Sequence, residues 1–497
     1  MKSSLSICIC FLFTSQLLFG KECKERTSAE KDVYFKIIVK GKNSLYPLKI
    51  AEYLHFIDFY EKPDVIKDPV LNWDGNCIFR FNKIKQPFYI CLYQDYPPNT
   101  NTLTYLLRYY LVEPGDSITL LITYDSTFKG LSYAYPFIIY QPNYRFQFLG
   151  KGSAKYQCRY ELEKYPHWDA GSSISTRIKN LVSDNDIVSE EILSQYKKGM
   201  SALSLNILKT DVNSMKRINT VEELEMQKQT IDSLMPEEFF DNENYKDDHG
   251  KNSIDESTKM LSVYYFQYLV ERAYLESRYK QNTAWKAYMK LKQDFHGELR
   301  DRLLTSFAFK LRTRRFGPEI LKDALSAIKT NYCLNELLFF DKNSIAGRPA
   351  YKFSLKTSNG KIVKLDDFKN KIVFLDFWFV GCDACYGYYG RTLGKVEDEF
   401  KNNSQVVFIS VNTDADLKRW KTALIGNKYT SDEAINVNTN GKGFHDPVIK
   451  NFHIIGYPWV AIINKDGKIL SNNSDSLKIK SPTALIAYIN DALKKTL

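Results

Sequence analysis

The 497-residue sequence has little of what metal, phosphate and nucleic-acid sites require. Its six histidines show no metal-ligand spacing, and it contains neither a glycine-rich phosphate loop nor a Gly-x-Ser-x-Gly nucleophile turn. The 69 lysines and arginines outnumber the 58 acidic residues, a net charge of +11, but they form no basic block, which indicates a solvated surface. We therefore expect no metal ion, no bound cofactor and no nucleic-acid partner.

Cysteine is scarce as well, and of the nine cysteines only Cys382 and Cys385 stand at a Cys-x-x-Cys spacing. The apolar run Ile372–Phe379 predicts a buried strand that breaks at Gly381, so the first cysteine falls where a helix should begin. The unpaired N–H groups and partial positive charge of a helix N-terminus stabilise a thiolate. Cys382 can then attack a disulfide and Cys385 can resolve the mixed intermediate. A structural disulfide or half of a zinc site are the alternatives, although no second Cys-x-x-Cys or histidine pair completes a zinc site.

The first twenty residues predict a secretory signal peptide. Lys2 precedes the uncharged stretch 3–20, rich in Leu, Ile and Phe, and a charged run follows. The alternative is an uncleaved membrane anchor, since this stretch is close to the lower limit of roughly 17 residues for a span. No later segment is apolar enough to cross a membrane. We expect export to the periplasm or cell envelope, with membrane contact only if the signal is uncleaved.

The remaining cysteines of the exported part are scattered and odd in number: Cys23, Cys77, Cys91, Cys158 and Cys333. An exported compartment permits disulfides, and Cys77 with Cys91 could bridge neighbouring strands. The alternative, which we favour, is that most of these residues are small buried hydrophobic side chains.

Length and composition indicate about three folded domains, with 44% hydrophobic and 14% aromatic residues. Residues 21–155 are predicted to be β-rich, because short aromatic and β-branched runs alternate with turn residues such as Glu113–Asp116. Residues 156–335 show apolar positions at helical spacing, for example Leu304, Phe307 and Leu311. A linker at about 336–348 should lead into a last domain at 340–497.

From about Ala346 to Leu497 the chain resembles the thioredoxin-like proteins of the TlpA/ResA type. GRPAYKFSLKTSNGKIVKLDDFKNKIVFLDFW is similar to the opening hairpin and central strand of that family, and IIGYPWVAIINKDGKIL to its cis-proline loop and following hairpin. More weakly, VEPGDSITL and FQFLGKGSAKY resemble the small β-domain that often precedes such a domain in envelope proteins. The resemblance implies a multidomain α/β plus β protein. It would have a C-terminal thioredoxin fold with a mixed sheet flanked by helices, a small N-terminal β-domain and a helical middle region.

The resemblance also implies roles for individual residues. Asp376, six residues before Cys382, corresponds to the buried acid that passes a proton to or from Cys385. Trp378 matches the tryptophan that shields the active site. Pro458, in cis, and the backbone of Tyr457 would hold an extended substrate segment. We therefore assign Cys382, Cys385, Asp376 and Pro458 to catalysis, and Trp378 and Tyr457 to substrate binding.

Three features depart from the family pattern. Gly381 stands where many relatives carry tryptophan, and Asp383-Ala384 replaces the commoner pairs that end in proline. Glycines follow the motif at 387 and 390, and Gly390 is expected to supply the bend that proline gives elsewhere. The negative charge of Asp383 should raise the pKa of the Cys382 thiol and make the dithiol a stronger reductant.

The expected function is therefore that of an exported thiol–disulfide oxidoreductase that reduces protein disulfides. A reductant in an oxidising compartment needs a membrane electron-donor protein as a partner. The alternatives are a disulfide isomerase or oxidase of envelope proteins, and a non-catalytic envelope binding protein on a thioredoxin scaffold. Peroxidase activity is disfavoured, because Phe379 and Leu375 stand where a peroxiredoxin would carry threonine and proline.

Overall fold

The structure is a computed structural model of the chain. It describes residues 30–40, 48–56, 65–71, 76–95, 103–127, 144–164, 187–226, 254–278, 283–311, 316–472, 474–478 and 480–494. The predicted signal peptide 1–20 and Cys23 lie outside the described residues. Within these ranges, no helix has both the length and the apolar character that a membrane span needs.

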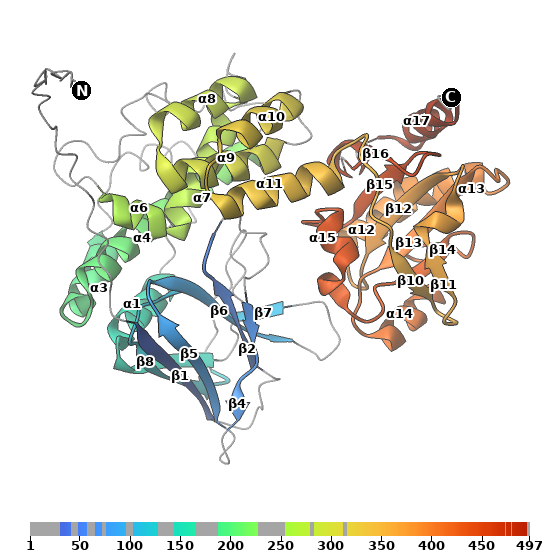
Figure 1. Cartoon of the computed structure of the whole chain (residues 1–497). Coiled ribbons are helices and arrows are strands. Elements are labelled where there is room, and N and C mark those ends of the chain that lie inside the picture. The colour runs from blue at the N-terminus through green and yellow to red at the C-terminus, as the bar shows by residue number, and fades with distance from the viewer. Residues whose placement is uncertain are drawn as a thin grey trace, which may run out of the picture.

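The N-terminal region is strand-rich, as predicted (Figure 1). Its strands are β1 (Lys31–Lys40), β2 (Leu48–Tyr53), β3 (Val65–Lys67), β4 (Val70–Leu71), β5 (Cys77–Ile84), β6 (Phe88–Asp95), β7 (Leu103–Val112), β8 (Ser117–Tyr124) and β9 (Tyr144–Lys151). They form one sheet in the order β4-β5-β1-β8-β9 and another in the order β3-β2-β6-β7. Strands β1 and β8 run parallel, whereas the other paired strands are antiparallel.

Strands β2, β6 and β7 of the second sheet are buried on both faces. Successive side chains of a strand point to opposite faces. In β6, Phe88, Ile90 and Leu92 belong to the core shared with the other sheet. The alternate residues Tyr89, Cys91 and Tyr93 belong to the core of the helical region. The β-rich and helical regions therefore share a hydrophobic core rather than standing as separate bodies.

The structure decides between the two expectations for the scattered cysteines. Cys77 and Cys91 lie on β5 and β6, in different sheets, and both are free thiols. The disfavoured possibility of a bridge between them is therefore excluded. Cys91, Cys158 and Cys333 are buried, which confirms the hydrophobic alternative for these three.

The middle region is helical, as the apolar spacing predicted. The described helices are α1 (Ser153–Lys164), α3 (Ile187–Tyr196), α4 (Ala202–Met226), α6 (Glu256–Leu261), α7 (Val263–Glu276), α8 (Ala284–Asp294), α9 (Gly297–Leu311), α10 (Gly317–Ala327) and α11 (Asn331–Ser344), with the 3-10 turn η1 (Lys197–Gly199). The linker expected at about 336–348 is wrong, because α11 occupies most of it. Its buried residues Cys333, Leu337 and Phe340 complete the core of the helical region.

The C-terminal part begins after α11. Its strands are β10 (Ser354–Thr357), β11 (Ile362–Lys364), β12 (Ile372–Trp378), β13 (Val406–Asn412), β14 (Ile435–Asn438), β15 (Trp459–Ile463) and β16 (Ile469–Ser471). Its helices are η4 (Leu365–Phe368), α12 (Asp383–Tyr388), η5 (Tyr389–Leu393), α13 (Gly394–Phe400), α14 (Leu417–Leu424), η6 (Gly443–His445), α15 (Pro447–Asn451), α16 (Ser474–Lys478) and α17 (Pro482–Lys494).

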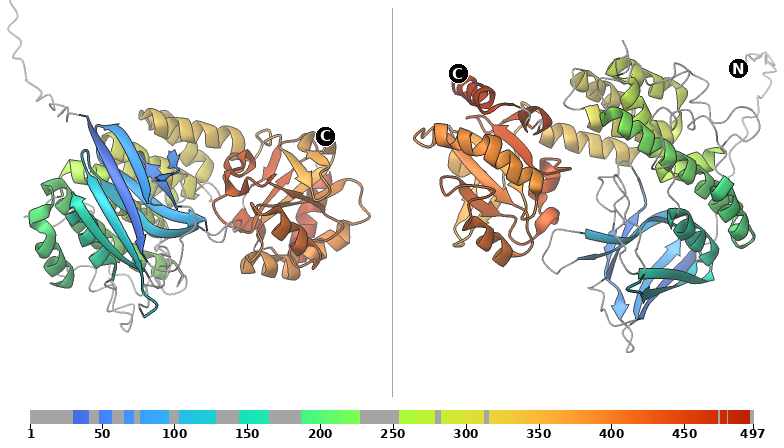
Figure 2. Two further views of the ribbon diagram at one scale, coloured as in Figure 1. Left: turned by 90° about the horizontal axis from the view of Figure 1, so that it is seen from below. Right: turned by 180° about the vertical axis from the view of Figure 1, so that it is seen from behind.

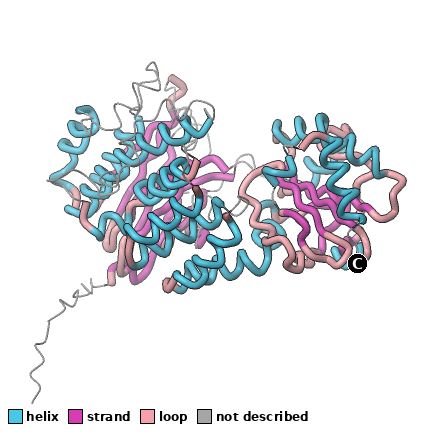
Figure 3. Tube along the Cα trace, turned by 90° about the horizontal axis from the view of Figure 1, so that it is seen from above, coloured by secondary structure: helices cyan, strands magenta, loops and turns pink. Residues whose placement is uncertain are grey.

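A mixed sheet in the order β11-β10-β14-β13-β12-β15-β16 forms the centre of this part (Figure 3). Strand β12 pairs in parallel with β13 and antiparallel with β15, and all seven of its residues are buried. One face packs on α12, α13 and α17, and the other on α15 and the segment before β12. The C-terminal domain therefore has the predicted thioredoxin-like fold.

Helix α11 connects the helical region to this domain (Figures 1 and 2). Phe340 of α11 and Phe309 of α9 contact His453, with ring centroids 5.0 and 4.9 Å away. The Ser344 hydroxyl donates to the carbonyl of Asn451 at 3.1 Å. The two parts meet through a small set of side chains at the end of α11.

Candidate active site

The two cysteines lie where β12 ends and a helix begins, as the sequence predicted. Gly381 turns the chain with a φ of +91°, which favours glycine. Cys382 is the N-cap of α12, and its sulfur accepts the backbone N–H of Cys385 at 3.1 Å. The structure joins the two cysteines in a disulfide, and they are 6% and 3% exposed. The pair is thus held at a helix start, one turn apart.

The helix after the motif has an irregular second turn. The 5-residue element η5 (Tyr389–Leu393) is a π-helical turn and contains Gly390. Such single π turns inside a helix widen it and occur often at functional sites. Gly390 therefore lies in a π turn between α12 and α13, and the bend expected from it stays a prediction.

Two buried acids, Asp376 and Glu397, stand on the strand before the cysteine turn and on a helix after it. Asp376 on β12 is 5% exposed, and its Oδ1 has no hydrogen-bond partner. Burial, and then the nearby charge of Glu397 on α13, raise the pKa of Asp376 well above its usual value. Burial also raises the pKa of Glu397 to about 7, opposed by hydrogen bonds from Ser431 and Tyr389. A carboxyl group that resists ionisation suits a proton carrier near neutral pH.

Trp378 is fully buried at the end of β12. Its indole N–H donates to the Ser410 hydroxyl on β13 at 2.6 Å. Tyr429 stacks on the indole with ring centroids 4.8 Å apart. Its assignment to substrate binding stays a prediction.

The predicted proline loop lies next to the cysteines. The Tyr457–Pro458 peptide bond is cis, as expected. Tyr457 packs against the cluster of Trp378, Cys382, Cys385 and Trp420. Its ring also meets those of Phe379 and Phe444, each with a centroid separation of 5.4 Å. The catalytic role of Pro458 and the binding role of Tyr457 stay predictions.

Sequence reasoning missed several side chains that complete this arrangement. Glu397 stands beside the apolar positions Leu393, Val396 and Phe400 of its helix, and a single acid among such positions was the signal that could have revealed it. Asp414, Arg419, Trp420 and Tyr429 come from the segment 412–455, which gave no motif. Among the described residues, no group of His, Cys, Asp or Glu is placed to hold a metal ion.

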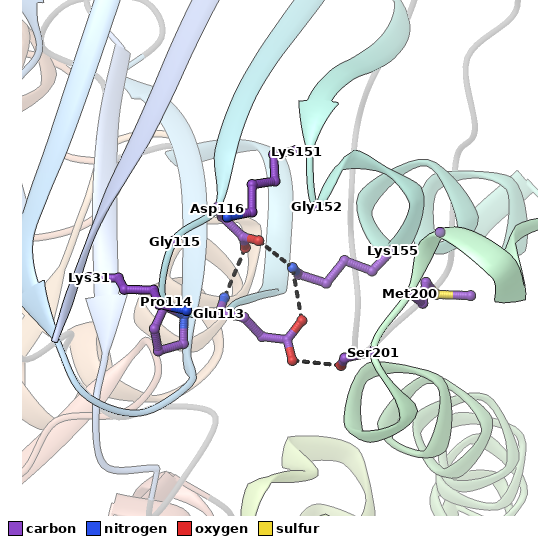
Figure 4. A pocket seen from close by; sticks show the side chains of 11 residues that line it. Lys31, Glu113, Pro114, Gly115, Asp116, Lys151, Gly152, Lys155, Met200 and Ser201 are labelled. Atoms are coloured by element: carbon purple, nitrogen blue, oxygen red, sulfur yellow. Dashed lines mark hydrogen bonds and ion pairs between the residues drawn. The ribbon is translucent and has the colours of Figure 1, made fainter. Parts of the chain in front are cut away.

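A cavity of about 420 Å³ lies far from the cysteines, at the predicted Glu113–Asp116 turn (Figure 4). The ammonium of Lys155 lies 2.7 Å from Asp116 and 3.1 Å from Glu113. Ser201 donates to Glu113 at 2.7 Å. The Lys155 ammonium lies between the two carboxylates and ties the turn to α1, and the Ser201 hydrogen bond ties it to the segment before α4.

The fold and the cysteine pair define the C-terminal part as a thioredoxin-like domain. Residues 346–471 match the family model described as "AhpC/TSA family". The thiol-disulfide oxidoreductase ResA of Bacillus subtilis (strain 168) is 42% identical over 55 residues, 11% of this chain and 31% of that protein. ResA of Bacillus cereus (strain ATCC 10987 / NRS 248) is 27% identical over 127 residues, 25% of this chain and 66% of that protein. The chain thus spans less than two thirds of the length of these curated relatives.

Two solved structures resemble the same part. The thioredoxin domain of a thiol-disulfide oxidoreductase from Bacteroides vulgatus is 25% identical, covers 30% of this chain and 97% of that chain, and has a TM-score of 0.26. A thiol:disulfide interchange protein DsbE from Chlorobium tepidum is 24% identical, covers 30% of this chain and 99% of that chain, and has a TM-score of 0.25.

Proposed function

We propose that this protein is an exported thiol–disulfide oxidoreductase that reduces disulfides of other proteins through Cys382 and Cys385. The observation that carries the proposal is the Cys-x-x-Cys pair at the start of α12, with Cys382 as its N-cap and the buried Asp376 on the strand that precedes it. The two curated relatives described above, ResA of Bacillus subtilis and ResA of Bacillus cereus, are thiol-disulfide oxidoreductases. Lys2 and the uncharged stretch 3–20 support export.

The reaction would proceed in two exchanges. The Cys382 thiolate attacks one sulfur of the substrate disulfide, which forms a mixed disulfide and releases one substrate thiolate. The Asp376 carboxylate accepts the Cys385 proton, and Cys385 then attacks the sulfur of Cys382 and releases the second substrate thiolate. Two electrons pass to the substrate, and the protein is left with the Cys382–Cys385 disulfide. A membrane electron-donor protein would return it to the dithiol.

The backbone at the bend of Tyr457 and Pro458 would receive the substrate. Tyr457 packs against the cysteine cluster, so a segment paired with its backbone would bring a disulfide to Cys382. The aromatic rings of Phe379 and Phe444 border this position. Trp378, which packs in one cluster with the two cysteines, would shield the active site.

The test is the redox potential of the purified protein, measured by equilibration with dithiol buffers, together with its rate of insulin reduction. We expect a potential nearer the roughly −270 mV of thioredoxin than the about −120 mV of the oxidant DsbA. A value above roughly −150 mV would favour the isomerase or oxidase alternative. Cys382→Ser should abolish insulin reduction, and a variant that stays active would refute the dithiol mechanism.

A further inference from the structure

Three side chains from the segment 412–430 hold the turn that precedes Cys382. Asp414 accepts the backbone N–H of Val380 at 2.8 Å. Arg419 donates from Nη2 to the carbonyl of Val380 at 2.7 Å. The Tyr429 hydroxyl accepts the N–H of Gly381 at 3.0 Å. The backbone just before the first cysteine is therefore fixed by a neighbouring segment through side chains.

The guanidinium of Arg419 lies directly beside Gly381. A Cβ added to Gly381 would stand 3.2 Å from Nη2 of Arg419, so a larger residue would crowd the arginine. Because consecutive Cα atoms are about 3.8 Å apart, the guanidinium lies within roughly 9 Å of the Cα of Cys382. A positive charge is thus present close to the sulfur that the proposed reaction ionises.

Helix α14 fixes the position of this arginine. Trp420, the next residue, is 2% exposed and packs in one cluster with Cys382 and Cys385. Asp416 caps the helix by accepting the N–H groups of residues 418 and 419. Arg419 itself is about one third exposed and lies 3.7 Å from Oδ1 of Asp414. A rigid helix therefore presents the guanidinium to the cysteine turn.

Several acids also stand near the pair, and a second guanidinium, that of Arg391, lies beside Gly387 on α12. Asp383 directly follows Cys382 and is exposed. Asp376 on β12 and Glu397 on α13 are buried acids of the same domain. Asp414 is also buried, and its Oδ2 already accepts two N–H groups, from Val380 and from the side chain of Asn412. Negative charges disfavour a thiolate, and a cation close by opposes them.

We propose that Arg419 is a positioning residue for Cys382, which holds the Val380 carbonyl and stabilises the Cys382 thiolate with its guanidinium against the surrounding carboxylates. The inference rests on the proposed dithiol function. Helix α14 would then influence the pKa, and so the reactivity, of the Cys382 thiol.

The test uses the full exported chain with Cys385→Ser, so that Cys382 reacts alone. The rate of iodoacetamide alkylation of Cys382 is measured from pH 5 to 9 in this parent and with added Arg419→Gln, which keeps a donor for Val380 but removes the charge. The guanidinium lies within about 9 Å of the Cα of Cys382, and so within about 11 Å of its sulfur. With a dielectric between those of protein and water, we expect an about twofold lower thiolate fraction on the rising part of the curve. Arg419→Lys should recover part of the loss.

Lys418→Gln is the matched control, because Lys418 is exposed on the same helix and its loss removes the same charge. An Arg419→Gln curve identical to that of Lys418→Gln overturns the inference and leaves the proposed function intact, provided that wild-type protein equilibrates with dithiol buffers. Wild-type protein that shows no such exchange overturns the proposed function itself.

Salt provides a measurement that does not depend on the folding of Arg419→Gln. In the parent carrying Asp383→Asn, raising the ionic strength from 0.1 to 1 M shortens the Debye length from about 10 to about 3 Å. Screening of Arg419 should then shift the alkylation curve to higher pH. A curve that does not move, or that moves to lower pH, overturns the inference.

Discussion

The buried acids Asp376 and Glu397 lower the stability of the folded protein increasingly as the pH rises. Burial raises the pKa of Glu397 to about 7 from an ordinary 4.5, and raises that of Asp376 as well. An acid whose pKa is higher in the folded state contributes stability that is fully present below its unfolded pKa. That contribution is lost as the pH rises through the folded value. For Glu397 the window is therefore about pH 4.5 to 7.

Glu397→Gln should consequently stabilise the protein at pH 8 and have little effect at pH 4. The side chain is 5% exposed, and a glutamine oxygen can still accept the hydroxyl of Ser431. With about 1.4 kcal/mol for each unit of pKa, the gain at pH 8 should reach up to about 3 kcal/mol in urea unfolding. The exposed Asp432→Asn serves as the control. An equal gain at both pH values would show a packing effect instead.

Replacing the second cysteine should trap substrates. Cys382 is the N-cap and Cys385 lies one turn inside the helix, so Cys385→Ser leaves an attacking thiol without its resolving partner. Mixed disulfides should accumulate in the envelope and be visible on non-reducing gels, with their masses identifying the partners. Cys382→Ser is the matched control and should trap none. The reverse pattern would exchange the roles of the two cysteines.

At the residue scale, the sequence predicted the parts of the site that are local. Cys382 at a helix start and the cis bond before Pro458 both followed from short motifs. Glu397 and Arg419 did not. Glu397 stands further along the helical segment that starts at the motif, in α13, and Arg419 reaches the cysteine turn through tertiary packing from α14. No local sequence pattern predicts that Arg419 lies beside Gly381.

At the element scale, strands and helices were predictable where their hydrophobic pattern was unambiguous. The run that forms β6 indicated a strand, but its apolar residues on both faces also meant that two partners must cover it. The linker expected around residue 340 failed for a related reason. Polar residues such as Lys342 and Asn343 obscured the helical pattern of α11. Its buried residues Leu337 and Phe340 pack into the core of the helical region.

Helix α14 should be essential for the stability of the C-terminal domain. Trp420 is almost completely buried against the disulfide and Trp378. Trp420→Ala should lower the free energy of unfolding by about 3–5 kcal/mol, the usual range for a buried aromatic residue. Leu417→Ala, at a 43% exposed position of the same helix, should change it by less than about 0.5 kcal/mol. Similar losses in the two variants, measured by urea unfolding, would contradict the packing described for α14.

At the scale of the whole molecule, α11 determines where the chain can be divided. The domain boundaries expected from the sequence, 156–335 and 340–497, stay predictions, but a cut at 335 would remove Leu337 and Phe340 from the helical core. A cut after Ile345 keeps them. The cut after Ile345 breaks the contact of Phe340 with His453 and the ion pair of Glu336 with Lys450.

We expect residues 21–345 and 346–497 each to unfold cooperatively when expressed separately. The first fragment retains the core between its two β-sheets and the core of the helical region. The second retains the whole sheet around β12. The second should reduce insulin, since the cysteine turn and α14 are intact. Fragment 21–335 should be less stable than 21–345, because each lost buried side chain costs about 2–5 kcal/mol. Urea unfolding followed by circular dichroism measures all three. Loss of cooperative unfolding in both 21–345 and 346–497 would show that the two parts fold only around a shared core.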